Sequence, residues 1–254
     1  MRQNLIFYQL INIFIFFILN LNANDIVILP YIDNQAALSF IQQYFPDKNP
    51  IIVEAGAFDG TDTLRMIEKF PDAIIHAFEP LPEGFELLKK NTKNYKNIRL
   101  YKLALGNKNG ISKFYTSEKS GKIWPSGSLL KPKEHVIVMP NIIFNDEIRV
   151  NTITLNDWAK KYNIHKIDFL WLDMQGFELF ALKSASRLLK TVKIIYTEVE
   201  FIELYTGQPL YCDVKKWLEK QGFILIAKDF TDAYETLDGI KCWFGNAIFL
   251  KTKK

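Results

Sequence analysis

The stretch IIVEAGAFDGTDT, residues 51–63, decides how this chain folds. Its first five residues are mostly β-branched and apolar, which is typical of a buried strand. Gly56 and Gly60 follow, and Thr61 with Asp62 then offers a helix start. Strand, glycine turn and helix start together form the usual frame for binding a nucleotide-like ligand, although the frame alone is a weak signal of function.

Strand and helix patterns alternate on both sides of this stretch. Strands are expected at 73–78, 97–105, 167–173, 192–200, 223–227 and 242–250, and helices at 35–45, 61–70, 83–94, 177–189 and 214–221. This alternation predicts an α/β fold with a doubly wound, mostly parallel sheet and helices on both faces. Residues 118–147 lack periodicity, so we expect a mobile surface excursion or a binding loop there.

The N-terminus differs from the rest of the chain. Residues 5–21, LIFYQLINIFIFFILNL, are nearly all apolar and follow Arg2. This pattern favours a secretory signal peptide cleaved near Ala23, with a membrane anchor as the alternative. The expected organisation is therefore a signal or anchor at 1–23, a helical extension at 24–50 and one catalytic-size domain at 51–254.

Charge and cysteine content exclude some classes of protein. Lys and Arg number 32 against 28 acids in 254 residues, and they are scattered, so nucleic-acid binding is not expected. Cys212 and Cys242 have no metal-ligand spacing to each other or to the three histidines. No metal site is therefore predicted, and whether the two cysteines pair is left open.

Three expected strands end in an acid: Glu54, Glu79 and Asp173. Ligands of open α/β sheets bind at the carboxyl ends of the strands. Glu79 follows Glu54 at roughly the twenty-residue spacing of a carboxylate that binds a ribose diol. The turn lacks G-x-G-x-x-G and carries Asp59, which would repel a pyrophosphate, and no P-loop occurs. A cationic ligand without phosphate, such as S-adenosylmethionine, suits these carboxylates better.

Several segments, taken in order, resemble the conserved blocks of the FkbM-type S-adenosylmethionine-dependent methyltransferases. They are EAGAFDGTDT, HAFEP, ALGN, TLNDWA, IDFLWLDMQGFELFAL and IYTEVEF. The resemblance spans about residues 51–250. It implies a class I, Rossmann-like methyltransferase fold with seven strands, the last antiparallel, and O-methylation of a hydroxyl on a sugar or other small acceptor. One departure is Gln175, where the family commonly has the Glu of D-x-E-G, so a role that needs a carboxylate there is in doubt.

The same resemblance implies the site residues. The cofactor would contact residues of four blocks: Glu54, Gly56, Ala57, Phe58, Gly60, Glu79, Pro80, Ala104, Leu105 and Asp173. Glu54, Gly56 and Gly60 would face the methionine part of S-adenosylmethionine. Glu79 would face its ribose, and Ala104 and Leu105 would face its adenine. Asp173 would lie between cofactor and acceptor.

Methyl transfer needs alignment of donor and acceptor and help with proton removal. The candidates for that help are Asp173, Glu198 and His135, with Glu200 beside Glu198 on one face of a strand. The alternatives are a solvated strand end for the two glutamates and an exposed loop position for His135. Trp124, in the irregular segment, is either core or a platform for a sugar ring.

Two rival functions stay open at this point: a catalytically inactive cofactor- or glycan-binding module on the same fold, and an NAD-dependent oxidoreductase. The expected partners are a small-molecule or glycan acceptor and, through residues 5–21, a membrane. If residues 5–21 act as an export signal or an anchor, the domain lies across a membrane from the cytosol, where its cofactor is made. If they do not act as a signal, we expect the protein in the cytoplasm.

Overall fold

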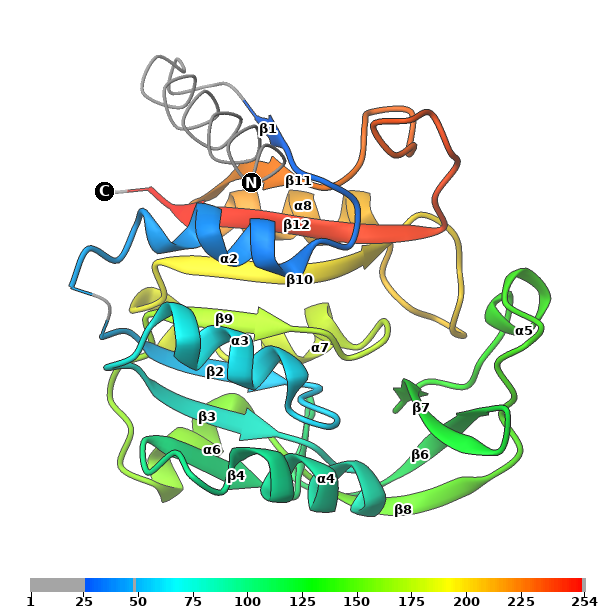
Figure 1. Ribbon diagram of the computed structural model, residues 1–254, viewed down its shortest axis with the longest axis horizontal. Helices are drawn as coiled ribbons and strands as arrows, with labels where there is room; N and C mark the ends of the chain where they lie inside the picture. The colour runs from blue at the N-terminus through cyan, green and yellow to red at the C-terminus, as the bar shows by residue number, and fades with distance from the viewer. Residues whose placement is uncertain (1–25, 48, 253–254) are drawn as a thin grey trace, which may run out of the picture.

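The computed structural model describes residues 26–47 and 49–252 and shows a large central sheet with helices on both sides (Figure 1). The sheet has eight strands in spatial order β4-β3-β2-β9-β10-β12-β11-β1. Their bounds are β4 (Ile98–Tyr101), β3 (Ile74–Phe78), β2 (Ile51–Ala55), β9 (Phe169–Leu172), β10 (Ile194–Glu200), β12 (Phe244–Lys251), β11 (Phe223–Lys228) and β1 (Val27–Ile28). Every residue of β9 and β10 is buried, as expected of central strands covered on both faces.

The seven expected strands and the antiparallel last strand are confirmed, because β12 runs antiparallel to both β10 and β11 while the other pairs are parallel. The short β1 adds an eighth strand at the β11 edge. The strand order reverses between β2 and β9, which pair directly. That reversal is the topological switch point, where ligands of such sheets bind.

Two helical layers cover the sheet. Helices α2 (Asn34–Gln42), α3 (Thr61–Lys69) and α4 (Pro82–Thr92) lie on one face, and α6 (Leu155–Lys161), α7 (Glu178–Lys183) and α8 (Tyr211–Lys220) on the other (Figure 1). Each layer encloses its own apolar core, one around Phe70 and Phe169 and the other around Trp158 and Phe249. Burial of these large side chains supplies the main driving force for folding.

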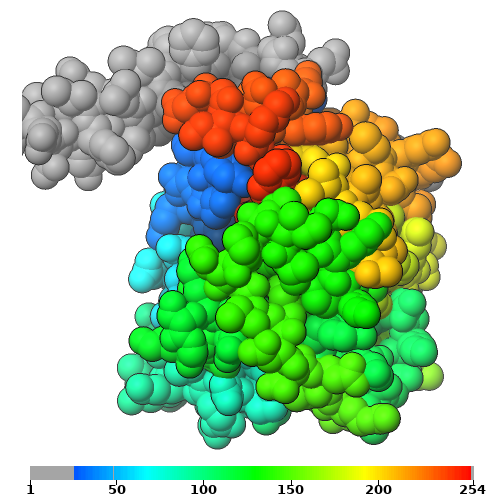
Figure 2. Space-filling view, turned by 90° about the vertical axis from the view of Figure 1, so that its right-hand side faces the viewer, coloured from blue at the N-terminus to red at the C-terminus, as the bar shows by residue number. Residues whose placement is uncertain are grey.

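A second sheet includes the first part of the irregular segment expected at 118–147, so that prediction was wrong for residues 118–128. Its order is β5-β8-β6-β7, with β5 (Ala104–Leu105), β8 (Glu147–Ile153), β6 (Gly110–Lys119) and β7 (Lys122–Ser128). A short helix, α5 (His135–Val138), lies between β7 and β8. The arrows of β2, β3 and β9 point toward this sheet, and residues coloured green cover that face of the molecule (Figures 1 and 2).

Some predicted element boundaries were also wrong. The strand expected at 97–105 splits into β4 and β5, because a tight turn with a hydrogen bond from Leu103 to the Tyr101 carbonyl redirects the chain into the second sheet. The helix expected at 177–189 is α7 followed by the 3-10 turn η1 (Leu188–Lys190). It breaks at Ser184, whose hydroxyl bonds the Ala181 and Gly106 carbonyls. The first helix ends at Gln42, before Phe45 packs edge-on against Phe70.

The cysteines are separate thiols, with Cys212 exposed and Cys242 buried. Across 26–47 and 49–252, no helix has the length and apolarity to cross a bilayer. The predicted signal or anchor, residues 5–21, lies outside the described residues.

Candidate active site

The switch point brings the ends of β2 and β9 unusually close. The Asp173 amide donates to the Ala55 carbonyl at 3.0 Å, and a Cβ built on Gly56 would lie 1.8 Å from the Asp173 carbonyl oxygen. Gly56 also has a φ of 90°, in the left-handed region that side chains disfavour. Only glycine therefore lets these two strand ends meet.

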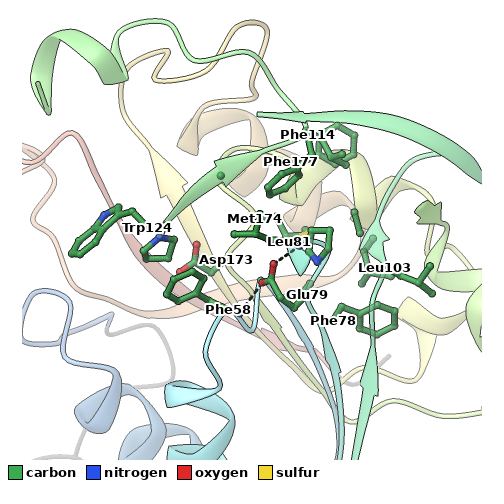
Figure 3. Close-up of a pocket in the computed structure, with 18 residues that line it drawn as sticks. Phe58, Phe78, Glu79, Leu81, Leu103, Phe114, Trp124, Asp173, Met174 and Phe177 are labelled. Carbon is green, nitrogen blue, oxygen red and sulfur yellow. Dashed lines mark hydrogen bonds between the residues drawn. The ribbon is translucent and has the colours of Figure 1, made fainter. Parts of the chain in front are cut away.

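A cavity opens at this point, between the strand ends and the second sheet (Figure 3). Ala55, Gly56 and Phe58 line it from the end of β2, and four residues, Phe78, Glu79, Pro80 and Leu81, from the end of β3. Leu103, Ala104 and Leu105 contribute a third wall. Asp173, Met174 and Phe177 line it from the end of β9, next to β2, and β6, β7 and the residue that follows β7 supply Phe114, Trp124, Pro125, Gly127 and Leu129. The lining is mostly apolar with two carboxylates, as small-molecule sites usually are.

Glu79 is fixed at the cavity wall by two backbone donors. The Phe58 amide donates to Oε2 at 2.8 Å and the Leu81 amide to Oε1 at 2.7 Å, both drawn as dashed lines in Figure 3. Burial raises the pKa of Glu79 to about 7, although these two hydrogen bonds oppose the shift. A carboxylate held this firmly is well placed to accept hydrogen bonds from a ribose diol.

Glu54 has a different role from the one that its position before the glycine suggested. It is buried, and the Thr63 hydroxyl donates to its Oε2 at 2.5 Å, so it anchors the first turn of α3 to β2. Glu54, Ala57 and Gly60 do not line the cavity. The structure does bring the other seven predicted cofactor residues together: Gly56, Phe58, Glu79, Pro80, Ala104, Leu105 and Asp173.

Gln175 forms hydrogen bonds with two of the predicted catalytic acids and so connects them. Its amide nitrogen donates to Asp173 Oδ1 and to Glu198 Oε2, both at 2.8 Å. Its amide oxygen lies 2.8 Å from the Tyr205 hydroxyl. Gln175 also has a positive φ of 54°, a strained conformation that these bonds help to hold. An amide here can bridge two carboxylates, which a glutamate could not do without a proton.

The alternative of a solvated strand end was wrong, because Glu198 and Glu200 are 7% and 2% exposed. His135 is not an exposed loop residue either. It begins α5 and is 1% exposed, with its ring packed edge-on against Phe144 and beside Tyr205. Burial lowers its pKa to about 4, and it does not line the cavity. Of the three predicted catalytic residues, only Asp173 faces the cavity directly.

Some lining residues escaped sequence reasoning. Phe114, on β6, comes from the second sheet and had no motif that could point to it. Met174 and Phe177 lie within the resembling block IDFLWLDMQGFELFAL, so their closeness to Asp173 was the available signal. Lining residues on the second sheet, such as Phe114, could therefore be identified only from the tertiary structure.

Comparison with known proteins agrees with this geometry. The model of the methyltransferase FkbM domain matches residues 54–225. The chain is 33% identical over 163 residues to 2-O-methyltransferase NoeI of Sinorhizobium fredii, covering 63% of this chain and 67% of that protein. It is 26% identical over 194 residues to Methyltransferase 1 of Beauveria bassiana, covering 70% and 74%. A crystal structure of a methyltransferase FkbM from Methylobacillus flagellatus aligns with a TM-score of 0.48 and 12% identity, over 80% of this chain and 44% of that one.

The fold, the cavity and the match to the family model define a class I methyltransferase that uses S-adenosylmethionine. The chain belongs to the FkbM methyltransferase domain family. This membership decides against the NAD-dependent alternative.

The residues that line the cavity are chemically suited to bind S-adenosylmethionine. Gly56 lets the ends of β2 and β9 meet at the cavity, and Glu79 offers a fixed acceptor for a diol. Asp173 supplies negative charge beside the cavity for a cationic ligand, and no basic residue lines it. We expect Glu79 and Asp173 to hold the polar parts of the cofactor, and the apolar wall at Leu103, Ala104 and Leu105 its base.

Proposed function

We propose that this methyltransferase acts on a hydroxyl group of a carbohydrate or a similar small acceptor. The observation that carries the proposal is the cavity itself, which is lined by the indole of Trp124, the carboxylate of Asp173 and the apolar ring of Phe177 (Figure 3). Aromatic faces bind sugar rings by apolar contact, and a carboxylate can orient a hydroxyl. The relative named as a 2-O-methyltransferase supports the same class of acceptor atom.

S-adenosylmethionine supplies an electrophilic methyl group when it is bound. The residues of this chain then have two tasks: to hold the acceptor oxygen in line and to take its proton. Asp173 lines the cavity, with one oxygen bonded to the Gln175 amide and its carboxyl group in contact with that of Glu198. We assign the proton to Asp173, with Gln175 fixing the orientation of the carboxylate and Glu198 held on the other side of the same amide.

The apolar lining serves the chemistry as well as binding. Phe114, Met174 and Phe177 keep water away from the region next to Asp173. Excluding water strengthens electrostatic interactions in the cavity and prevents loss of the methyl group to solvent. The hairpin of β6 and β7 therefore contributes to the acceptor side of the site, and β2, β3 and β5 contribute the cofactor side.

The test is transfer of a radiolabelled methyl group from S-adenosylmethionine to a panel of mono- and oligosaccharides by the full chain. We expect labelled product with at least one acceptor and none with the matched deoxy sugar that lacks the methylated hydroxyl. Labelling confined to amines or thiols would contradict the proposal. Binding of S-adenosylhomocysteine without transfer to any acceptor would favour the catalytically inactive module.

A further inference from the structure

Three glutamates meet behind the cavity, next to the bridge made by Gln175. Glu178 is the first residue of α7, and Glu198 and Glu200 alternate along β10, so they share one face of that strand. One carboxylate oxygen from each can be chosen so that all three lie within 4.8 Å of one another. All three side chains are buried, with exposed fractions of 2%, 7% and 2%.

Among the described residues, neutral amides donate to these carboxylates, and Glu198 also contacts the carboxyl group of Asp173. The Met174 amide donates to Glu178 Oε1 at 2.6 Å, and the Gln175 side chain donates to Glu198 Oε2. Glu200 Oε1 is fully buried and has no hydrogen-bond partner among the described residues. No ion pair between described residues includes any of the three glutamates. A buried carboxylate without a partner is costly, so such a group calls for an explanation.

We propose that Glu178, Glu198 and Glu200 bind one hard divalent cation. Three carboxylate oxygens are the donor set that Ca²⁺, Mg²⁺ and Mn²⁺ prefer, whereas Zn²⁺ and Cu²⁺ favour sites with nitrogen or sulfur. Oxygens bound to one Ca²⁺ ion lie at most roughly 4.6–5.2 Å apart, twice the usual Ca–O distance, so three oxygens within 4.8 Å of one another are close enough to share such an ion. The unpartnered Glu200 oxygen becomes a ligand, which accounts for its lack of a hydrogen-bond donor.

The site also accounts for the glutamine at position 175. Gln175 reaches Glu198 with its amide nitrogen, so it orients a proposed ligand without adding a fourth negative charge. Outer partners of this kind commonly fix metal-binding carboxylates. The prediction of no metal site rested on the spacing of cysteines and histidines, and this cluster contains neither.

The competing explanation is that the glutamates hold protons and no ion. Burial raises the pKa of Glu178 to about 8, and burial together with mutual repulsion raises the pKa values of Glu198 and Glu200 as well. Protons and a cation relieve the same repulsion, so a binding measurement is needed to separate them.

The experiment uses the full chain, treated with a chelator, desalted and held near pH 8. Titration with Mn²⁺ is followed by electron paramagnetic resonance, and titration with Ca²⁺ by calorimetry. We expect one ion per chain, with Ca²⁺ displacing Mn²⁺. Glu200→Gln and Glu178→Gln should each weaken binding at least tenfold. Glu68→Gln, the same change at an exposed glutamate of α3, should leave it unchanged.

Two results would overturn the proposal. One is a folded wild-type protein that fails to saturate at millimolar ion, which would mean that protons occupy the cluster. The other is wild-type affinity in the folded Gln variants, which would place the ion elsewhere. If a variant does not fold, a measurement on the wild type can replace it. With ¹³C at the glutamate side-chain carboxyls, we expect bound Mn²⁺ to show ¹³C hyperfine coupling. Absence of this coupling would contradict the assignment.

Discussion

Gly56 carries the tightest steric constraint among the residues of the site. We expect Gly56→Ala to lower the free energy of unfolding by about 3 kcal/mol or more, because the new methyl group would overlap the Asp173 carbonyl oxygen and force β2 and β9 apart. Urea denaturation measures the loss. Cofactor affinity should fall with it, since the same displacement deforms the cavity.

Gly121→Ala is the matched control for this substitution. Gly121 has a φ of 70°, yet a Cβ there would meet no atom within 4 Å. It therefore reports the backbone strain alone, about 1–2 kcal/mol. Equal losses in the two variants would show that the contact with Asp173 is not what constrains position 56.

Single residues also show where sequence reasoning succeeds and where it stops. Glu79 and Asp173, which were predicted to contact the cofactor, both line the cavity, because the carboxyl end of a parallel strand has a fixed place in the fold. Glu54 has the same kind of position but points to Thr63. Whether such a side chain points into the cavity or toward the next helix depends on how that helix packs. The residues next to it in the sequence do not determine this.

At the scale of elements, the hairpin of β6 and β7 supplies the acceptor side of the cavity. We expect Trp124→Ala to lower kcat/KM for the acceptor about tenfold or more through a higher KM, since stacking on an aromatic ring contributes about 0.5–1.5 kcal/mol beyond the lost contact area. Trp124→Phe should recover much of the loss. Steady-state kinetics with a saccharide acceptor measures both variants.

A cofactor readout separates this role from a general structural one. The affinity for S-adenosylhomocysteine should stay within a factor of about three in Trp124→Ala, because the cofactor side of the cavity comes from β2, β3 and β5. A parallel loss of cofactor and acceptor affinity would mean that Trp124 supports the whole cavity.

The same hairpin shows why part of the fold was not predicted. The central sheet has continuous apolar strands such as IDFLWLD, and these are strong signals. Strand β6 is half exposed and carries lysines, and β7 contains Pro125, which is tolerated because β7 lies at the edge of its sheet. Strands of this kind are defined by their partners in space, so only their tertiary pairing identifies them.

For the whole molecule, buried acids make stability depend on pH. Burial raises the pKa of Glu54 to about 8 from an ordinary value of 4.5. The folded chain keeps this proton up to about pH 8, whereas the unfolded chain loses it above about pH 4.5. Its contribution to stability is therefore fully present below pH 4.5 and is lost as pH rises through 8.

We expect Glu54→Gln to reduce this pH dependence by about 2 kcal/mol between pH 6.5 and 8. His76 acts in the opposite direction at lower pH, because burial lowers its pKa to about 4 from 6.5, and its contribution is lost as pH falls through 4. Above pH 6.5, the pH dependence of stability therefore contains the contribution of the buried acids without that of His76. Urea denaturation across that range gives the comparison, and parallel curves for wild type and variant would contradict the assignment.

The central claim is that the cavity at the switch point binds S-adenosylmethionine through Glu79. Calorimetric titration of the full chain with S-adenosylhomocysteine tests it most directly, with Glu79→Gln as the variant and NAD as the control ligand. We predict binding in the micromolar range by the wild type, at least tenfold weaker binding by the folded variant, and none of NAD. A folded wild type that does not bind the compound, or a variant that binds it equally well, would contradict the account.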